Sequence, residues 1–326
     1  CPSQTRCTED KMLRDKIYWI SAAGVSYPLS GEETREVLQG RTGFVMPPAE
    51  YSEYVLPLQA GSILRQVQFR ARTVTIPILL TQPTRYLLLQ DMKLLSSAFD
   101  PTKGKGRIRV AISNDSNIAT TYDLNCIYTG GFEGEMSAEG GGLTYSKFVA
   151  TFRAFDPYWY SGESIGYFFG SNPNVPFLSS NTGNYFLPLH VGSSGNVGSA
   201  VSVNNTGDVD SWPVWTIYGP GTNPTFTNAT SGKFLTLATT LSATEKVVVD
   251  TREGVKTVLK YTLSAGTQGS SGTYTTTGVN LFSSIFAGSS LWSFPTGTSS
   301  VTVLMDSGSP GVSSVLVTSG LRYLSV

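Results

Sequence analysis

Residues 67–80 run VQFRARTVTIPILL, and polar and apolar side chains alternate along most of this stretch. A period of two residues is typical of a strand with one face in a core and one face outside. Pro77 stands near the end of the stretch, where a strand tolerates a missing N–H. We therefore expect one long half-buried strand here, in a fold built largely from β-structure.

A single helix is expected directly after this strand. Leu88, Met92, Leu95 and Phe99 are spaced by four, three and four residues, which places them on one helical face. Thr81 and Pro83 supply a cap and a first turn, and the Asp100-Pro101 pair ends the helix. Further strands are expected at 17–20, 107–112, 122–128 and 143–155, and residues 32–38 fit either a brief helix or a charged loop.

Charge divides the chain into two dissimilar halves. Residues 1–163 hold 17 basic and 17 acidic side chains, whereas residues 164–326 hold six of each and 50 Ser or Thr. Such a shift marks a domain boundary, and hydroxyl-rich, charge-poor sequence with recurring Val is typical of short strands joined by turns. We expect an N-terminal domain at 1–163, a connector at 164–199 and a C-terminal jelly-roll β-sandwich at 200–326. Its strands are expected near 200–204, 213–218, 225–228, 234–237, 246–250, 255–259, 301–305 and 312–317.

Net charge is zero across 326 residues, which argues against a dedicated binder of nucleic acid or anionic membrane. The sequence has no run of 18 apolar residues and no signal-peptide pattern at its start. Of the three cysteines, Cys126 alternates with apolar residues and is expected to be a buried thiol. Cys1 and Cys7 could pair with each other or lie loose, and the origin of the first eleven residues is left open.

No catalytic or cofactor site stands out. The one histidine, His190, lies in an apolar stretch and is expected to be a packed residue. The carboxylate pairs Glu133/Glu135 and Asp208/Asp210 could in principle serve a glycosidase, but acids on loops are usually solvated. Residues 204–210 have oxygen ligands without the spacing of a calcium loop, and no zinc or P-loop pattern is present. We expect no enzyme activity, no cofactor and no bound metal.

Two groups of residues could contact a partner. Lys103, Lys105, Arg107 and Arg109 would line one face of an extended segment, which could meet acidic groups or simply protect a sheet edge. Trp212, Trp215 and Trp292 could stack on sugar rings or anchor a protein, although core packing between sheets is the simpler alternative for them.

The order of motifs resembles that of the distal tail proteins of long-tailed, non-contractile bacteriophages. No single motif is distinctive, but the ordered set spans nearly the whole chain, and its most specific member is Asp156-Pro157-Tyr158-Trp159. The other segments are Gly40–Gly43 with Pro47-Pro48, Pro57–Ser62, Arg72–Pro77, Leu95–Arg109, Phe152–Phe155, Asn205–Trp215 and Val248–Arg252.

This resemblance implies a structural virion protein of the phage tail tip, made in the host bacterial cytoplasm. The N-terminal domain would be a split β-barrel-like hub with one helix, six copies of which form a ring that continues the tail tube. DNA would only pass through the lumen, without membrane insertion. The C-terminal domain, similar to galectins and carbohydrate-binding modules, would dock receptor-binding proteins or other tail-tip and baseplate proteins.

Three functions are compatible with the sequence. The first is the hexameric hub, whose expected partners are its own copies, the tail tube protein, the tail-tip hub or tail-associated protein, and receptor-binding proteins. The second is a lectin-like adhesion module that uses Trp212, Trp215 or Trp292. The third is a glycan hydrolase with one of the carboxylate pairs. Fold alone does not separate them, because jelly rolls serve all three roles.

Overall fold

A computed structural model describes residues 15–56, 60–113, 119–133, 142–170, 197–269, 271–309 and 312–326. The chain divides into two compact units, and we describe each by itself. Unit 1 comprises Cys1–Gly162 and Arg322–Val326, and unit 2 comprises Glu163–Leu321. Of the expected connector at 164–199, residues 171–196 lie outside the described residues.

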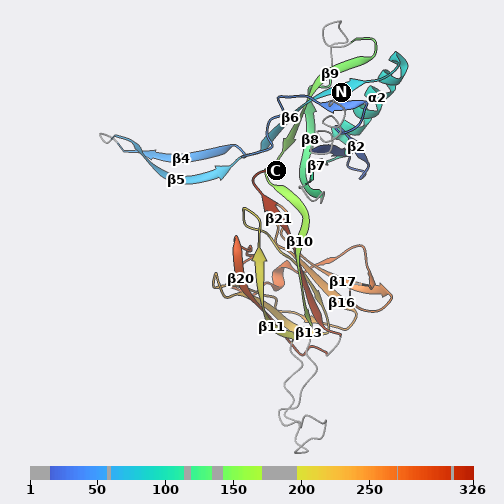
Figure 1. Cartoon of the computed structure of the whole chain (residues 1–326). Coiled ribbons are helices and arrows are strands. Elements are labelled where there is room, and N and C mark those ends of the chain that lie inside the picture. Colours follow the sequence, from blue (N-terminus) through green and yellow to red (C-terminus); the bar gives the residue numbers. More distant parts are fainter. Residues whose placement is uncertain are drawn as a thin grey trace, which may run out of the picture. The chain divides into compact units, whose positions relative to one another are not determined.

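Unit 1 is built on an antiparallel sheet that curves around one apolar core (Figure 1). Its strand order is β2-β1-β7-β8-β9-β6-β3, with β10 also paired to β8. Strand β8 pairs with β7 through its first part and with β9 through its last residues, so it belongs to both halves of the sheet. The strands are β1 (Lys16–Ile20), β2 (Ser26–Pro28), β3 (Arg35–Val37), β6 (Arg72–Thr81), β7 (Gly106–Ser113), β8 (Ala119–Gly130), β9 (Tyr145–Ala154) and β10 (Trp159–Gly170).

Helix α2 (Arg85–Phe99) packs one face against this sheet, and the short 3-10 helix η1 (Pro101–Lys103) follows it. Leu88, Leu95 and Phe99 are buried as the periodicity predicts. The predicted cap was wrong by one turn: Thr84 is the N-cap, and its hydroxyl accepts a hydrogen bond from the Leu87 N–H at 3.3 Å. Residues 32–38 were expected to form a brief helix or a charged loop. Instead, residues 35–37 form strand β3, which pairs with β6.

The predicted single strand at 67–80 is two strands, and this is the main correction to the predicted fold of unit 1. Among the described residues, strand β5 (Ser62–Phe69) pairs only with β4 (Ala49–Val55). Strand β6 begins at Arg72 and pairs with β9 and β3. Residues 70 and 71 contain neither Gly nor Pro, so no local signal marks the break. We call the β4–β5 hairpin the arm; Figure 1 shows it standing clear of the other strands of unit 1.

The end of the chain returns to unit 1. Arg72 is buried and donates hydrogen bonds to the carbonyl oxygens of Gly43 and Leu324. The guanidinium of Arg322 lies 4.1 Å from the ring centre of Tyr158. Trp159, from the Asp-Pro-Tyr-Trp motif, is fully buried. Unit 1 is therefore completed by residues from both ends of the chain.

Unit 2 is a β-sandwich of two antiparallel sheets. One has the order β11-β20-β13-β14 with β15 beside β13, and the other contains β18-β17-β16-β12-β21 with β19 beside β17. The 3-10 helix η2 (Phe282–Ser284) precedes β20. The strands are β11 (Val197–Asn205), β12 (Val214–Tyr218), β13 (Gly221–Asn228), β14 (Lys233–Thr236), β15 (Thr240–Leu241), β16 (Glu245–Asp250), β17 (Thr257–Ala265), β18 (Thr273–Tyr274), β19 (Val279–Asn280), β20 (Gly297–Asp306) and β21 (Ser314–Tyr323).

The core of unit 2 lies between these sheets and is rich in aromatic rings. Trp215 on β12 packs against Phe226 on β13 with 4.4 Å between ring centres, and against Trp292 at 5.5 Å. Alternate residues of each strand point into this core, which explains the period-two pattern of the sequence. The mainly-β fold class is confirmed, with one α-helix in the described residues.

Candidate assembly surface

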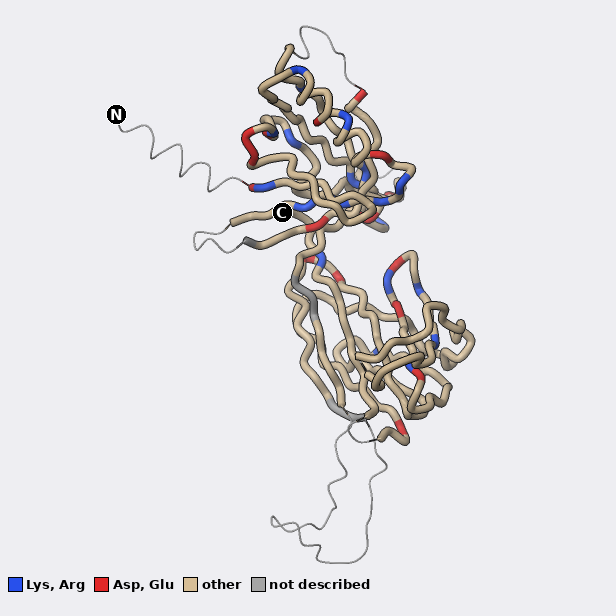
Figure 2. Tube along the Cα trace, turned by 90° about the vertical axis from the view of Figure 1, so that its right-hand side faces the viewer, with Lys and Arg blue, Asp and Glu red and all other residues tan. Residues whose placement is uncertain are grey.

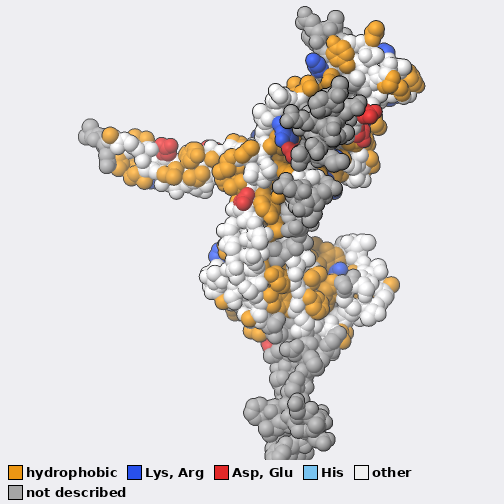
Figure 3. Space-filling view, viewed as in Figure 1, with side chains coloured by type: hydrophobic (Ala, Val, Ile, Leu, Met, Phe, Trp, Pro, Cys, Tyr) orange, Lys and Arg blue, Asp and Glu red, His pale blue; other side chains and the backbone are white. Residues whose placement is uncertain are grey.

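The arm has one apolar and one more polar face. Its register pairs Tyr51 with Val67 and Glu53 with Leu64, and because paired residues point to the same side, these four share a face with Val55. Leu64 and Val55 are 56% and 68% exposed. Figure 3 shows hydrophobic side chains along the arm. The arm thus presents a strip of large apolar side chains that the described part of the chain leaves uncovered.

The other face of the arm carries most of its charge. Arg70, just past the end of β5, forms an ion pair with Glu50, and the hydrogen bond and charge of Arg70 lower the pKa of Glu50. The Arg65 guanidinium lies 4.7 Å from the centre of the Tyr54 ring. No carboxylate of the described residues pairs with Arg65. Arg65 therefore lies with Tyr54 on the face opposite the apolar strip, and the strip itself includes the acid Glu53.

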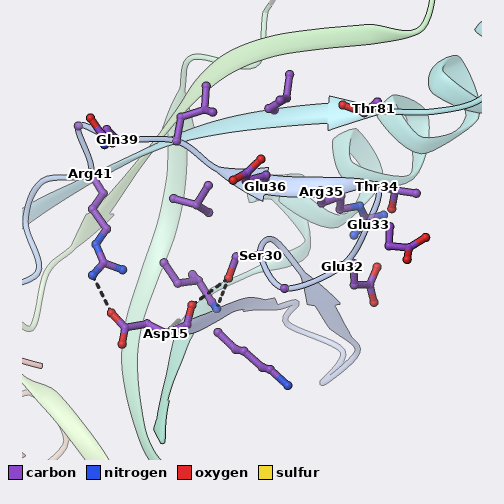
Figure 4. Close-up of a pocket in the computed structure, with 17 residues that line it drawn as sticks. Asp15, Ser30, Glu32, Glu33, Thr34, Arg35, Glu36, Gln39, Arg41 and Thr81 are labelled. Carbon is purple, nitrogen blue, oxygen red and sulfur yellow. Dashed lines mark hydrogen bonds and ion pairs between the residues drawn. The ribbon is translucent and has the colours of Figure 1, made fainter. Parts of the chain in front are cut away.

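A groove of about 1360 Å³ lies in unit 1, between the start of β1 and strand β3 (Figure 4). We call it the seam groove, because it lies between the two ends of the curved sheet. Ile17, Val37 and Leu79 contribute apolar surface to it, and Glu32, Glu33 and Glu36 lie along the loop and strand on its other side. Its shape results from the strand order, since β1 and β3 do not pair with each other.

Strand β3 has a free edge in this groove. The Leu38 N–H donates to the Pro77 carbonyl of β6, and the Thr81 N–H of β6 donates to the Thr34 carbonyl. In an antiparallel pair every second residue directs its N–H and C=O toward the partner strand. The backbone N–H and C=O of Val37 therefore point away from β6. Among the described residues β3 pairs only with β6, apart from a turn bridge between Glu32 and Arg35. An exposed strand edge of this kind is a template for a further strand.

Within the described residues the two arginines of the groove are paired, whereas Lys16 and two glutamates are not. Arg35 forms a buried ion pair with Asp91 of α2 and donates to the Pro28 carbonyl. Arg41 pairs with Asp15 at 2.6 Å. Glu32 and Glu33 have no ion pair within the described residues and are exposed. The side of the groove formed by residues 32–36 is therefore acidic, and Lys16 lies on the β1 side.

The three tryptophans singled out in the sequence are not equivalent. Trp215 and Trp292 are 0% and 2% exposed, and their rings pack together inside unit 2. Neither presents a ring face that a sugar or a protein could reach. Trp212 is half-buried, with the Lys256 amino group 5.8 Å from its ring centre. Of the three, Trp212 alone stays a candidate for partner contact.

The candidate catalytic residues do not gather into a site within the described part of the chain. Glu133 accepts a hydrogen bond from the Gly131 N–H, and Asp210 accepts one from the Ser293 hydroxyl. His190, Glu135, Cys1 and Cys7 lie outside the described residues. The described residues hold no group of three or more potential metal ligands. Cys126 is buried as predicted, and burial raises the pKa of its thiol to about 12.

The predicted row of four cations is only partly formed. Lys103 lies in η1, where its amino group donates to Ser97, and so it is not on an extended segment. Arg107 and Arg109 lie on β7, and both contact Asp123 of β8. The two hydrogen bonds from Arg109 to this carboxylate are each 2.7 Å. The single carboxylate of Asp123 thus pairs with both guanidinium groups and balances one of their two charges.

The motifs of the sequence do not predict the arm or the seam groove. A signal for the arm was present, because β-prone runs at 51–55 and 62–69 flank a loop that contains Pro57 and Gly61. The groove had no comparable signal, since it arises from strands far apart in sequence. No helix of the described residues is long and apolar enough to cross a membrane.

No protein-family model matches the sequence, and no curated protein matches it significantly. Among solved structures, the Dit protein of phage SPP1 matches with a TM-score of 0.59 at 13% identity, over 94% of this chain and 98% of that chain. It is described as a paradigm of the hub adsorption apparatus in phages that infect Gram-positive bacteria. The resemblance expected from the motifs is confirmed at the level of the fold.

Two structures of the phage P2 baseplate in its activated conformation also match over 94% of this chain and 98% of theirs. The one with calcium has a TM-score of 0.48 at 11% identity, and the one with strontium has 0.49 at 10%.

Proposed function

We propose that this chain is a structural hub protein of a bacteriophage tail tip. Six copies close into a ring that joins the tail tube to the tail tip or baseplate and docks host-adhesion proteins. The observation that carries this proposal is the fold shared with the Dit protein over nearly the full length of both chains. A likeness that covers both units supports a common architecture better than a likeness of one β-sandwich, which is a widespread fold.

The arm gives this proposal a physical basis in the chain itself. An isolated two-stranded hairpin is at best marginally stable in water, and this one also exposes Tyr51, Val55, Leu64 and Val67. Exposed apolar strips of this kind mark protein contacts. In a self-assembling protein, neighbouring copies cover such a strip. The strip can therefore be apolar without making the assembled protein insoluble.

The distribution of charge fits a division of labour between the two units. Figure 2 shows most charged residues in unit 1 and few in unit 2. Charges of both signs can set the register and partner of a self-contact, so we assign ring formation to the N-terminal domain at 1–163. The C-terminal domain at 200–326 would dock receptor-binding or other baseplate proteins. With a neutral balance, the ring would let DNA pass without gripping its phosphates.

The location follows from this role: the protein would be made in the host cytoplasm and would reside at the tip of the virion tail. Its other partners would be the tail tube protein and the tail-tip hub or tail-associated protein. We propose no enzymatic activity for it, because the protein whose fold it shares over both units is described as part of a hub adsorption apparatus.

Electron microscopy and mass photometry of the purified full chain test the hub. Rings of six copies are expected at micromolar concentration, because ring contacts are weak singly and close cooperatively. A protein that stays monomeric up to about 100 µM would contradict the proposal. The lectin alternative requires glycan binding that Trp212→Ala abolishes. The hydrolase alternative requires glycan cleavage that Glu133→Gln or Asp208→Asn removes.

A further inference from the structure

We propose that the outer face of the sheet formed by β12, β16 and β17 in unit 2 binds an acidic saccharide, with Lys246 at the centre of the site. The other members of the site are Tyr218, Tyr261, Gln268 and Tyr274, and we call all five the tyrosine–lysine cluster. The inference goes beyond the proposed ring and does not depend on it.

Strand register brings three members of the cluster into one row. Lys246 on β16 is paired with Tyr218 of β12 and with Tyr261 of β17, so the three side chains point to the same side of the sheet. Ile217 and Val247, which precede and follow members of the row, are fully buried. Because successive side chains of a strand point to opposite faces, the core lies on the other side of the sheet and the row faces outward.

The connection from β17 to β18 supplies the remaining two members. Tyr274 of β18 is paired with Leu263, which lies on the same face of β17 as Tyr261. The ring centre of Tyr274 is 6.2 Å from that of Tyr218. Gln268 donates a hydrogen bond from its side-chain amide to the backbone carbonyl directly after Tyr218. The row is therefore joined on its outer side by two polar or aromatic groups from a second segment.

Lys246 is a half-buried cation that has no carboxylate partner among the described residues. Its amino nitrogen lies 3.9 Å from the ring centre of Tyr274 and 5.6 Å from that of Tyr261, which is within the range of a cation–π contact. Glu245 precedes it on β16 but points to the other face and pairs with Lys260 at 2.8 Å. Burial lowers the pKa of the Lys246 amino group, because the rings do not fully replace the water lost by the charge. An anionic group of a ligand would supply the missing counter-charge.

The groups around this cation favour a saccharide as the carrier of the anion. Tyr261 and Tyr274 are half-buried, so part of each ring is open to a flat apolar surface such as the C–H face of a sugar. Ser242 and Thr244 add exposed hydroxyls just before β16, and Gln268 adds an amide. Small-ligand sites combine aromatic side chains with a few polar groups that fix orientation, as this cluster does.

An acidic peptide is the competing ligand, and the position of the cluster favours it less. Strand β16 is flanked by β12 and β17, and β12 is flanked on its other side by β21. The cluster therefore lies within a sheet, away from any strand edge that could pair with a peptide. An extended peptide gains much of its affinity from such backbone pairing, whereas a stacked and charged sugar needs only side chains.

Calorimetric titration of the full-length protein with two matched pairs of sugars tests the site. Cellobiouronic acid differs from cellobiose by a carboxylate, and glucose 6-phosphate differs from glucose by a phosphate. At least one acidic sugar should bind about tenfold or more tightly than its neutral counterpart, because only the acidic sugar can pair with Lys246. If neither acidic sugar binds more tightly than its counterpart at concentrations up to about 20 mM, the proposal is wrong.

Single variants locate the site. Lys246→Met keeps the length of the side chain and should weaken binding of the acidic sugar about tenfold or more, while Lys246→Arg should retain it. The matched control is Lys233→Met, which removes an exposed cation from β14 in the other sheet and should leave binding unchanged. Trp212→Ala should also leave it unchanged, because Trp212 precedes β12 whereas Tyr218 ends it. Circular dichroism verifies that each variant folds.

Three outcomes separate this site from its alternatives. Equal binding by Lys246→Met and Lys233→Met would overturn the role of Lys246. A short polyglutamate peptide that binds more tightly than either acidic sugar would overturn the assignment to a saccharide. Mass photometry of the same samples measures ring formation independently: Lys246→Met should assemble as the wild type does, and a wild-type monomer that still binds the acidic sugar would overturn the hub and support the site.

Discussion

The Nη2 atom of Arg72 donates a hydrogen bond of 2.6 Å to the carbonyl oxygen of Leu324, which is 252 residues further along the chain. The Nη1 atom of the same guanidinium donates to the Gly43 carbonyl at 3.0 Å, and its carbon lies 5.8 Å from the centre of the buried Trp159 ring. Burial lowers the pKa of Arg72 to about 10, so the side chain still carries its charge at neutral pH. One residue at the start of β6 thereby joins three distant segments of unit 1.

Replacing Arg72 with Met should lower the free energy of unfolding of unit 1 by about 2–4 kcal/mol. The variant keeps the bulk of the side chain but leaves two carbonyl groups without their charged donor. Urea unfolding measures the loss. Arg153→Met, which removes an exposed cation from β9, should change stability by less than about 0.5 kcal/mol; equal effects of the two variants would contradict the role given to Arg72.

The ion pair between Arg35 and Asp91 should be costly to break from one side. Both side chains are 8% exposed, and Gln82 also donates to Asp91 at 3.2 Å. Asp91→Asn should destabilise unit 1 by about 3 kcal/mol, because the Arg35 charge stays buried without its partner. Arg35→Met combined with Asp91→Leu should recover much of this loss in thermal unfolding. If Asp91→Asn were as stable as the double variant or more stable, this reasoning would be refuted.

Unit 2 should lose stability in acid through Asp250. Burial acts to raise the pKa of this carboxyl, but hydrogen bonds from the Arg252 side chain and backbone outweigh burial and lower it below 3.8. Because the folded pKa lies below the unfolded one, the stabilisation is present above about pH 4 and disappears as the pH falls through the folded value. Urea unfolding at pH 7 and pH 3 should show a smaller difference for Asp250→Asn than for the wild type. Identical pH dependence would exclude this contribution.

The thiol of Cys126 should be unreactive in the folded protein. It is 1% exposed, and burial raises its pKa to about 12, so almost none of it is thiolate at pH 8. With Cys1 and Cys7 changed to Ser, iodoacetamide should leave the native protein unlabelled by mass spectrometry and label it fully in 6 M guanidinium. Rapid labelling of the native chain would show that unit 1 opens around β8.

Replacing a buried tryptophan of unit 2 should cost more stability than replacing a half-buried one. Trp215→Ala should cost about 3–5 kcal/mol, because it removes a ring that packs against Phe226 and Trp292 and leaves a cavity between the sheets. Trp212→Ala should cost less than about 1 kcal/mol, because that ring is half-buried. Thermal unfolding of both variants checks the contrast. A larger loss of stability for Trp212→Ala than for Trp215→Ala would contradict the core position given to Trp215.

Features with a strong local signal were predictable from the sequence. The helix follows from the spacing of Leu88, Leu95 and Phe99, and the strands near 107–112 and 122–128 follow from their alternation, which extends a few residues further in β7 and β8. The same alternation could have placed Trp215 inside, because Ile217, two residues on, shares its face of β12. Residue type suggested a binding role for this tryptophan, but the strand period indicates a core position.

Features that depend on distant partners were not predictable. The break between β5 and β6 has no glycine or proline at 70–71; it arises because β5 pairs with β4 and β6 pairs with β9. The seam groove arises from the absence of pairing between β1 and β3, and the return of the last residues depends on Arg72. No window of neighbouring residues contains this information, which explains why the candidate assembly surface emerged from the structure alone.

The placement of Arg322–Val326 in unit 1, after all of unit 2, has a consequence for synthesis on the ribosome. The N-terminal part of unit 1 leaves the exit tunnel long before Leu324 does, so Arg72 has no Leu324 carbonyl to bind until unit 2 has been synthesised. A chain that stops within unit 2 would therefore lack a completed unit 1. The nesting of one unit within the other thus makes completion of the first unit depend on synthesis of the second.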